Sequence, residues 1–301
     1  MLSICIPIHN FDVRSLIEDL LSQGNKLAVP FELILIDDCS EERFKNINKF
    51  SCEKASYIEL DKNIGRSKIR NLFLEYAQFE NLLFLDCDSI ICKSDFLEIY
   101  VQQILKGTYN VICGGRIYPE KCPARNKSLS WKYGSLIESK NEVERSNSHN
   151  NSFMSNNFMI KKVVFLKVKF DESIVTYGHE DTLFGIELDL RNLKVYHIYN
   201  PILNGDIELN HVFLLKTEES IINLNIIYKK HNYDNSFAKN VLLINFYLKL
   251  KSKKLIHIVD FFFYLCKYPI KFLLKQGLIN LKLFNFYKLG FFSSIQKNQS
   301  K

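Results

Sequence analysis

The chain has 301 residues, of which 47% are hydrophobic and 24% are charged, and its formal net charge is +7. This composition is that of a globular protein and excludes a chain that is disordered over most of its length. The charge is uneven, because residues 1–214 hold 25 Lys and Arg against 29 acidic residues, whereas residues 215–301 hold 15 Lys against 4. We therefore predict two regions, 1–214 and 215–301, the second suited to an anionic partner.

Apolar runs and helical spacings alternate along the first region. Residues 3–8, 32–36, 57–60, 82–85 and 111–113 predict strands, residues 13–23 predict a helix, and further helices are expected from Arg66 and from an N-cap at Ser94 to about Leu105. This order predicts an α/β fold with a mostly parallel sheet between helices, and ligands at the carboxyl ends of its strands. Residues 120–155 are polar and predict a long connection or mobile loop.

The N-terminus and the cysteines bear on the compartment. The chain opens on a strand and lacks the basic and apolar segments of a signal peptide. Its eight cysteines form no matched pair of Cys-x-x-Cys motifs, which argues against a zinc ribbon and favours buried free thiols in a reducing compartment. We therefore expect a cytoplasmic protein, peripheral to the inner face of the cell membrane if the second region binds lipid.

Two carboxylates follow the predicted strand at 82–85. Asp86 and Asp88 stand two residues apart where a buried strand gives way to a turn. Such a pair can share a hard divalent cation, and Mg²⁺ or Mn²⁺ bridges the oxygens of a diphosphate. The structural alternative is a solvated turn, or an Asp that caps a helix. The position after a strand favours a metal site.

Five motifs in a fixed order carry a resemblance to a known family. The chain resembles family 2 glycosyltransferases with the GT-A fold over about residues 1–214. The motifs are Ser-Ile-Cys-Ile-Pro7-Ile-His-Asn, Ile-Leu-Ile-Asp37-Asp38, Asn63-Ile-Gly-Arg66-Ser-Lys-Ile-Arg70-Asn71, Phe-Leu-Asp86-Cys-Asp88 and Gly178-His-Glu180-Asp181. The resemblance implies a Rossmann-like catalytic domain with a helical C-terminal appendage.

The resemblance also implies roles for residues around a nucleotide-sugar donor. Asp38 is expected to hydrogen-bond the nucleobase, uracil in the first instance, with Pro7 framing the pocket. Arg66 is expected to reach the nucleotide or its phosphates, Asp86 the ribose or the metal, and Asp88 to be the principal metal ligand.

Four further residues near these motifs have structural roles as their alternative or expected interpretation. Asp37 is either part of the site or a turn-forming residue that caps local backbone. Arg70 is expected to brace the fold rather than to bind ligand. Asn156 and Asn157 precede a strand and either face the donor sugar or form a polar strand-edge turn.

Glu180 and Asp181 precede an apolar helical pattern. Their bland interpretation is helix capping, because carboxylates are favoured at a helix N-terminus. The resemblance implies that Asp181 is the general base that deprotonates the acceptor hydroxyl and that Glu180 orients the acceptor. Direct attack on the anomeric carbon implies inversion of configuration.

His211 lies 30 residues after Asp181. The Gly-His-Glu-Asp segment is also similar to the C-terminal motif of galactosyltransferases and chondroitin-polymerase-type enzymes, where a downstream His completes the metal site. His211 is accordingly a second metal ligand, or else a structural His; imidazole ligation favours Mn²⁺. His179 stands where that motif usually has Gly, so the motif does not predict the contacts to the acceptor in this chain.

The second region has no motif that we can assign. Its Lys residues stand beside Phe, Tyr and Leu, which fits either a basic amphipathic surface for anionic lipid or a helical appendage with solvated Lys. Asp260, Lys267 and Lys271 argue against a spanning helix in residues 255–274. No Arg occurs in this region, so nucleic acid is not expected as a partner.

Together these features predict an inverting, metal-dependent hexosyltransferase of surface polysaccharide or glycolipid synthesis. Its expected partners are a nucleotide-sugar, UDP-linked in the first instance, and a glycan or lipid-linked acceptor, with a membrane surface as a further option. The alternatives are an inactive nucleotide-sugar or glycan-binding module and a nucleotidyltransferase. The latter needs a Gly-rich loop after the first strand, and residues 8–12 contain no Gly.

Overall fold

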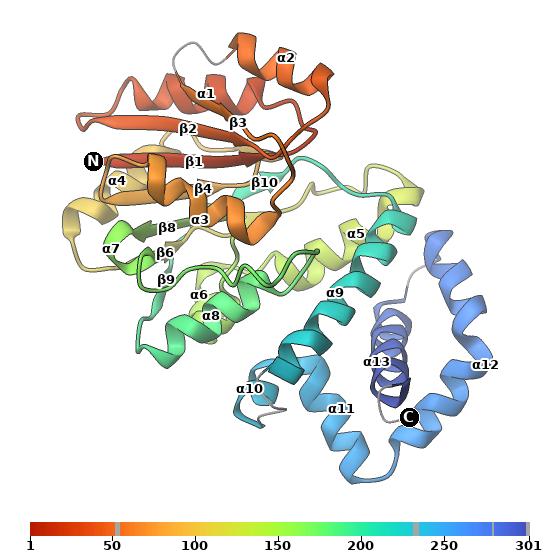
Figure 1. The fold of residues 1–301 in the computed structure, drawn as a ribbon. Coiled ribbons are helices and arrows are strands. Elements are labelled where there is room, and N and C mark those ends of the chain that lie inside the picture. Colours follow the sequence, from red (N-terminus) through yellow and green to blue (C-terminus); the bar gives the residue numbers. More distant parts are fainter. Residues whose placement is uncertain (52–54, 231–234, 279, 299–301) are drawn as a thin grey trace. The chain divides into compact units, whose positions relative to one another are not determined.

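Seven strands form the main sheet of the protein (Figure 1), here described from a computed structural model. The structure describes residues 1–51, 55–230, 235–278 and 280–298. The sheet has the order β3-β2-β1-β4-β8-β6-β9, and β8 alone among these runs antiparallel to its neighbours. The strands are β1 (Leu2–Ile8), β2 (Phe31–Asp37), β3 (Ser56–Glu59), β4 (Asn81–Leu85), β6 (Val111–Cys113), β8 (Asn157–Lys161) and β9 (Val195–His197). The predicted α/β fold with a mostly parallel sheet is confirmed.

Helices pack on both faces of this sheet and bury its central strands on both sides. Alternate residues of β1 enter two separate cores, Ile4 and Ile6 one of them and Cys5 the other. Helices α1 (Arg14–Gly24) and α4 (Phe96–Lys106) contribute to the first core, and α3 (Arg66–Tyr76), α7 (Lys162–Phe165) and α8 (Glu180–Leu190) to the second. Helix α2 (Glu42–Ser51) lies between β2 and β3 in the chain.

A second, three-stranded sheet lies at the carboxyl end of β4. It has the order β5-β10-β7, with β5 (Ser89–Ile91), β10 (Ile202–Asn204) and β7 (Arg116–Ile117). Strand β5 follows Asp88 directly, and the Gly205 amide donates to the Asp88 carbonyl at 3.0 Å. This sheet therefore anchors the C-terminal end of the Asp86–Asp88 segment.

Two predictions about local structure are wrong. Helix α4 begins at Phe96, with Asp95 rather than Ser94 at the N-cap position. The amide of Leu97 is capped from a distance by the Gln23 side chain, at 3.1 Å, so local sequence does not determine this helix start.

The second wrong prediction concerns residues 120–155, which are not one long loop. They contain η1 (Arg125–Lys127), α5 (Ser128–Tyr133), η2 (Gly134–Glu138), α6 (Glu142–Ser146) and η3 (His149–Ser152). The short helix α6 has a capping box, in which Asn141 and Glu144 each bond the other's backbone amide, at 2.9 and 3.2 Å. Such a box stabilises a helix too short for periodicity to reveal.

The described chain divides into two compact units. We call residues 1–118, 137–175 and 180–206 the sheet unit, and residues 119–136, 176–179 and 207–301 the helical unit. The predicted boundary after residue 214 stays a prediction. The helical unit contains α5, α9 (Asn210–Lys230), α10 (Asn235–Asn240), α11 (Leu242–Ser252), α12 (Ile256–Lys275) and α13 (Leu281–Asn298).

The helical unit has its own apolar core. Leu129 of α5, Leu214 of α9, Phe263 and Leu274 of α12 and Tyr287 of α13 are buried together there. In the part of the chain that the structure describes, no helix has the length and apolar character needed to cross a membrane. Each of the seven described cysteines is free.

Candidate active site

Asp86 and Asp88 leave the end of β4 in different environments. The Asp86 carboxylate accepts from the buried Arg70 guanidinium at 2.6 Å and lies 3.5 Å from Nη2 of Arg66. Arg70, only 2% exposed, also donates to the Arg66 carbonyl, as expected of a brace. No side chain among the described residues pairs with the half-buried Asp88 carboxylate. Asp88 is thus the member of the pair that is open to a ligand.

Arg66 joins this pair of acids to the second one. It is the first residue of α3, and its Nε donates to the Glu180 carboxylate at 2.8 Å while Nη2 faces Asp86. Glu180 is the first residue of α8, as predicted, and Asp181 follows it. Segments 94 residues apart in sequence, at Asp86 and Glu180, therefore meet at one guanidinium.

The environment separates the two acids of each pair electrostatically. Burial raises the pKa of Asp86, but the charges of Arg70 and Arg66 outweigh it, so the net shift is downward. The same balance, with Arg66 ahead of Arg70, lowers the pKa of Glu180. Burial and a charged neighbour instead raise the pKa of both Asp88 and Asp181 to about 6. Divergent pKa values within an acid pair are typical of sites where one carboxylate is held ionised and the other is used.

Asp181 is the less restrained acid of its own pair. One of its oxygens accepts from the Thr182 amide at 2.7 Å, and the other has no partner in the described part of the chain. A half-buried carboxylate with one free oxygen and a pKa near 6 can accept a proton from a ligand hydroxyl.

The carboxylates fit a divalent cation in part. Asp88 offers oxygen donors that form no ion pair with any described residue, although the charges of Arg116 and Arg66 act on it from farther away, and such donors suit Mg²⁺ or Mn²⁺. Among the described residues no cluster of three or more His, Cys, Asp or Glu is suited to hold a metal ion. A cation bound by one or two carboxylates takes its remaining ligands from water and substrate phosphates, as is usual for Mg²⁺.

Three residues outside the predicted set form a hydrogen-bonded group whose arginine, Arg116, interacts electrostatically with Asp86 and Asp88. Nη1 of Arg116 donates to the Tyr118 hydroxyl and to the Glu138 carboxylate, both at 3.0 Å, and Tyr118 also donates to Glu138. The negative charges of Asp86 and Asp88 contribute to raising the Arg116 pKa, against the effect of burial. The buried Nε of Arg116 has no acceptor among the residues that the structure describes. Its position after Gly114-Gly115, at the end of a predicted strand, is a sequence signal that could have identified it.

The turn before Arg116 is fixed by a buried cation. Arg145, only 2% exposed, donates to the carbonyls of Cys113, Gly114 and Ile198 at 2.8–3.2 Å. Gly115 has φ +90°, and a Cβ there would lie 2.6 Å from the Arg145 guanidinium. Burial and the nearby Arg145 charge lower the pKa of His197 to about 4, so this neighbour stays neutral and accepts from Arg145 at 3.3 Å. We call Arg145, His197 and the turn Gly114–Gly115 the arginine clamp.

The first acid pair lies at the end of β2. Asp37 is fully buried and accepts from the Ser40 amide and the Tyr57 hydroxyl, at 2.7 and 2.9 Å, which agrees with its turn-forming alternative. Asp38 is 5% exposed and accepts from the amides of Ile64 and Gly65, at 2.6 and 3.1 Å. It thus holds the loop that leads into α3 and Arg66. Each carboxylate oxygen has a further lone pair, and the nucleobase contact stays a prediction.

Pro7 lies near the carboxyl end of β1, opposite Ile36 of β2. The pairing of β1 with β4 ends at Cys5, so the missing amide hydrogen of Pro7 breaks no bond to that strand. Its predicted place at the nucleotide pocket remains untested.

The two asparagines before β8 differ. The Asn157 amide is fully used, by the Tyr100 hydroxyl and the carbonyls of Gly115 and Asn200, at 2.6–2.9 Å. The Asn156 amide is 4% exposed, and in the described ranges neither its oxygen nor its nitrogen has a hydrogen-bond partner. The Asn156 carbonyl accepts from the Asp86 amide at 3.1 Å, which places this orphaned amide beside the acid pair.

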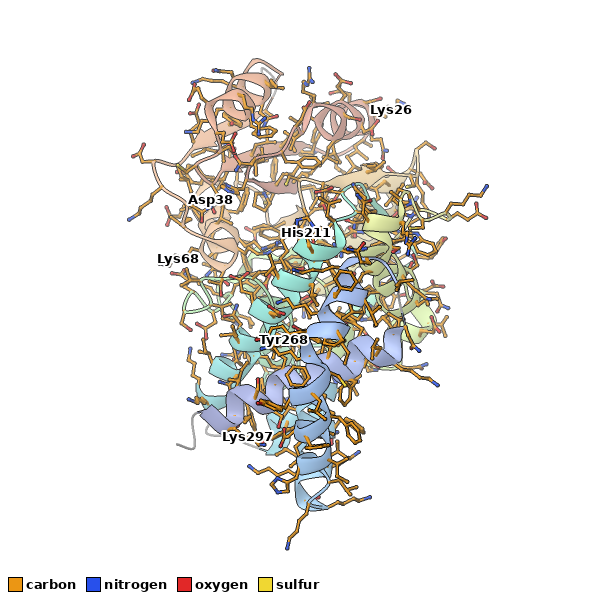
Figure 2. The ribbon with its side chains drawn as sticks, turned by 90° about the vertical axis from the view of Figure 1, so that its right-hand side faces the viewer. Lys26, Asp38, Lys68, His211, Tyr268 and Lys297 are labelled. Atoms are coloured by element: carbon orange, nitrogen blue, oxygen red, sulfur yellow. The ribbon has the colours of Figure 1, made fainter. Side chains whose placement is uncertain are left out.

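His211 belongs to the helical unit, where it is exposed in the first turn of α9 (Figure 2). The acids belong to the sheet unit. Metal ligation by His211 therefore stays a prediction.

The mostly parallel sheet, with helices around it and acids at its strand ends, defines the class of protein by its fold, which is the GT-A fold. The family model for glycosyl transferase family 2 matches residues 3–168, and the chain belongs to this family. An uncharacterized glycosyltransferase of Haemophilus influenzae is 29% identical over 171 residues. That match covers 56% of this chain and 55% of the relative, so the chain spans about half the length of this curated protein.

Solved structures share the fold. The mannosyltransferase PcManGT from Pyrobaculum calidifontis, in complex with GDP-Man and Mn²⁺, has a TM-score of 0.64 at 14% identity, covering 99% of this chain and 86% of its own. S. aureus TarS 1-349 in complex with UDP-GlcNAc has a TM-score of 0.53 at 16% identity, covering 99% and 92%. At these identities the likeness establishes the fold alone.

Proposed function

We propose that the protein transfers a sugar from a nucleotide-sugar, in a divalent-cation-dependent and inverting reaction, to an acceptor hydroxyl of a surface polysaccharide or glycolipid. The observation that carries this proposal is the single guanidinium of Arg66, which pairs with Asp86 and Glu180, whereas Asp88 and Asp181 form no ion pair with any residue that the structure describes. One acid open to a metal and one open to a hydroxyl, in the same site, fit transfer from a diphosphate donor. The two nucleotide-sugar complexes among the solved structures support a donor of this class.

The residues divide the work between donor and acceptor. Asp88, with Asp86, would hold the cation, which when bound supplies positive charge that stabilises the departing diphosphate. Asp38 and Pro7 frame the nucleoside, and a uracil base is the first choice. The unpaired amide of Asn156 is suited to a hydroxyl of the donor sugar. His211 is retained as a proposed second metal ligand and favours Mn²⁺.

Asp181 acts as the general base in this proposal. Its free carboxylate oxygen takes the proton of the acceptor hydroxyl while the hydroxyl oxygen attacks the anomeric carbon and the bond from that carbon to the diphosphate breaks. Glu180 helps to orient the acceptor. Attack on the side opposite to the diphosphate inverts the configuration of that carbon. An anionic membrane surface is proposed as a partner of the helical unit, which would hold the enzyme near lipid-linked acceptors.

A panel of UDP- and GDP-sugars, incubated with the full chain and Mn²⁺, tests the proposal by release of nucleoside diphosphate. We expect slow Mn²⁺-dependent hydrolysis of one donor, which a chelator stops. Binding of the same donor without any hydrolysis or transfer would favour the inactive binding module instead. Release of pyrophosphate from a nucleoside triphosphate and a sugar phosphate would favour the nucleotidyltransferase.

The pH dependence of transfer follows from Asp181. A raised pKa of about 6 means that the carboxylate takes up a proton below that pH, so the fraction of ionised base falls about tenfold for each further pH unit. At saturating Mn²⁺ and donor, we expect log kcat to decline with a slope of one below about pH 6 and to level off above it. A kcat that is flat from pH 4.5 to 8 would contradict the role of Asp181 as base.

Arg116 offers a test of the diphosphate contact. Its buried Nε has no acceptor within the described part of the chain, whereas Glu138 and Tyr118 accept from Nη1, so we propose that Nε contacts the donor diphosphate. Arg116→Met is expected to weaken nucleoside diphosphate binding about tenfold or more, since charge-assisted bonds contribute about 1.5–3 kcal/mol. Nucleoside binding should stay within about twofold of wild type. Arg191→Met, at an exposed position of the same unit, is the matched control; an equal loss for nucleoside and diphosphate would refute the contact.

A further inference from the structure

The outward face of α12 is unusually apolar for an exposed helix. Its buried side contains Phe263, Ile270 and Leu274, which belong to the core of the helical unit. On the opposite side seven large apolar residues are each between 52% and 82% exposed. These residues, with Tyr268 labelled in Figure 2, are Ile258, Phe261, Phe262, Tyr264, Leu265, Tyr268 and Phe272.

The spacing of these residues makes them one continuous surface. Positions 258, 261, 265, 268 and 272 recur at steps of three and four, which places them on one side of the helix along about 21 Å. An aromatic side chain has roughly 150–250 Å² of surface, so the five aromatic residues alone expose on the order of 500 Å². A soluble surface seldom keeps that much contiguous apolar area without a partner.

Two charged residues of α12, Asp260 and Lys271, are paired inside the helical unit. Asp260 accepts from Ser293 and pairs with Lys297, each at 2.6 Å. Lys271 pairs with Glu218 of α9 at 2.6 Å. Asp260 and Glu218 are therefore each neutralised by a lysine of their own unit.

Exposed lysines border the apolar surface at both ends of α12. Lys251, Lys253 and Lys254 precede the helix and Lys275 ends it. Residues 215–301 contain 15 Lys against 4 acidic residues, so a second copy of this region would bring like charges together. An apolar, aromatic strip between clusters of lysine fits the boundary between anionic headgroups and acyl chains, where Lys reaches the phosphates and Tyr keeps its hydroxyl in water.

We propose that the outward face of α12 docks the protein on an anionic lipid surface, with the helix lying in the plane of the membrane. The apolar residues of this outward face, from Ile258 to Phe272, enter the membrane interface. The lipid phosphates are contacted by the lysines at the two ends of the helix, Lys251, Lys253, Lys254 and Lys275. None of these residues belongs to the proposed catalytic site. This docking specifies the membrane partner without depending on the transfer reaction.

Co-sedimentation of the full chain with vesicles tests the docking face. We expect the wild type to bind vesicles of phosphatidylcholine and phosphatidylglycerol and to bind pure phosphatidylcholine at least about tenfold more weakly. The triple variant F261S/Y268S/F272S should lose about tenfold or more in affinity for the anionic vesicles. The control, L105S/L190S, removes two similarly exposed apolar residues from the sheet unit and should bind as the wild type does.

Two further measurements keep the outcome decisive. Circular dichroism and nucleotide binding of the triple variant should match the wild type, which separates a docking defect from a folding defect or a failed active site. In F261W, quenching by brominated lipids is expected to place the new indole in the acyl region. Unchanged vesicle binding by a folded triple variant would overturn the proposal, and so would a wild-type dimer that this variant converts to a monomer.

Discussion

Asp88→Asn is expected to abolish cation-dependent donor binding. Asp88 has no ion-pair partner in the described chain, whereas Asp86 is committed to Arg70 and Arg66, so an amide at position 88 leaves the cation no uncompensated carboxylate. Removal of this ligand should lower the affinity for Mn²⁺ in the presence of nucleoside diphosphate at least ~100-fold, more than the loss of an outer-shell contact. Isothermal titration of Mn²⁺, with and without the nucleotide, measures this change.

Stability distinguishes a ligand from a structural residue in this experiment. Burial and Asp86 raise the pKa of Asp88 to about 6, so the ionised carboxylate opposes folding at neutral pH when no cation is bound. Asp88→Asn should therefore keep or raise the Tm of the metal-free protein. Asp19→Asn, at an exposed position of α1, is the matched control and should change neither Mn²⁺ affinity nor Tm. A large fall in the Tm of Asp88→Asn would mean that Asp88 is a structural turn residue.

Asp181→Asn is expected to remove transfer while leaving the donor site intact. The substitution keeps the shape of the side chain and its contact with the Thr182 amide but takes away the proton acceptor. Loss of a general base typically costs ~10²–10⁴-fold in rate, and we expect kcat to fall within that range while the donor Kd stays within about twofold. Steady-state transfer and equilibrium donor binding, measured on one preparation, separate the two effects.

Glu180→Gln provides the contrast to this variant. Glu180 holds Arg66 at 2.8 Å, so its loss should disturb donor and acceptor binding together and change both KM values rather than kcat alone. If Asp181→Asn transferred sugar at the wild-type rate, its role as base would have to be abandoned, and the two acids would be left as the N-terminal residues of α8.

The fold could be predicted from the sequence where burial decides the pattern. Strands such as β4 are apolar on both faces and are followed by acids, which signals a parallel sheet and its ligand edge without tertiary information. The start of α4 could not be predicted, because the capping group is Gln23, more than 70 residues away. The helices within residues 120–155 were missed because segments of three to six residues contain too few positions for a period.

The candidate site was predictable in part for the same reason. The sequence identified the four acids Asp86, Asp88, Glu180 and Asp181, because they adjoin a clearly predicted strand or helix. It does not show which acid of each pair is held by arginine. That distinction arises from Arg66, which bonds Glu180 and faces Asp86, a choice that only the packing of α3 against the sheet reveals. Arg116 was overlooked because its partner Glu138 lies in a region that reads as loop.

The arginine clamp has a consequence for swapping loops among relatives. Arg145 comes from one segment, yet it secures the ends of two strands, at Cys113 and Ile198, and it requires a glycine at position 115. If residues 137–152 were replaced by a segment without an arginine at position 145, the buried carbonyl groups of Cys113, Gly114 and Ile198 would lose this hydrogen-bond donor. Redesign of acceptor preference should accordingly exchange positions 114, 115, 145 and 197 as a single cassette.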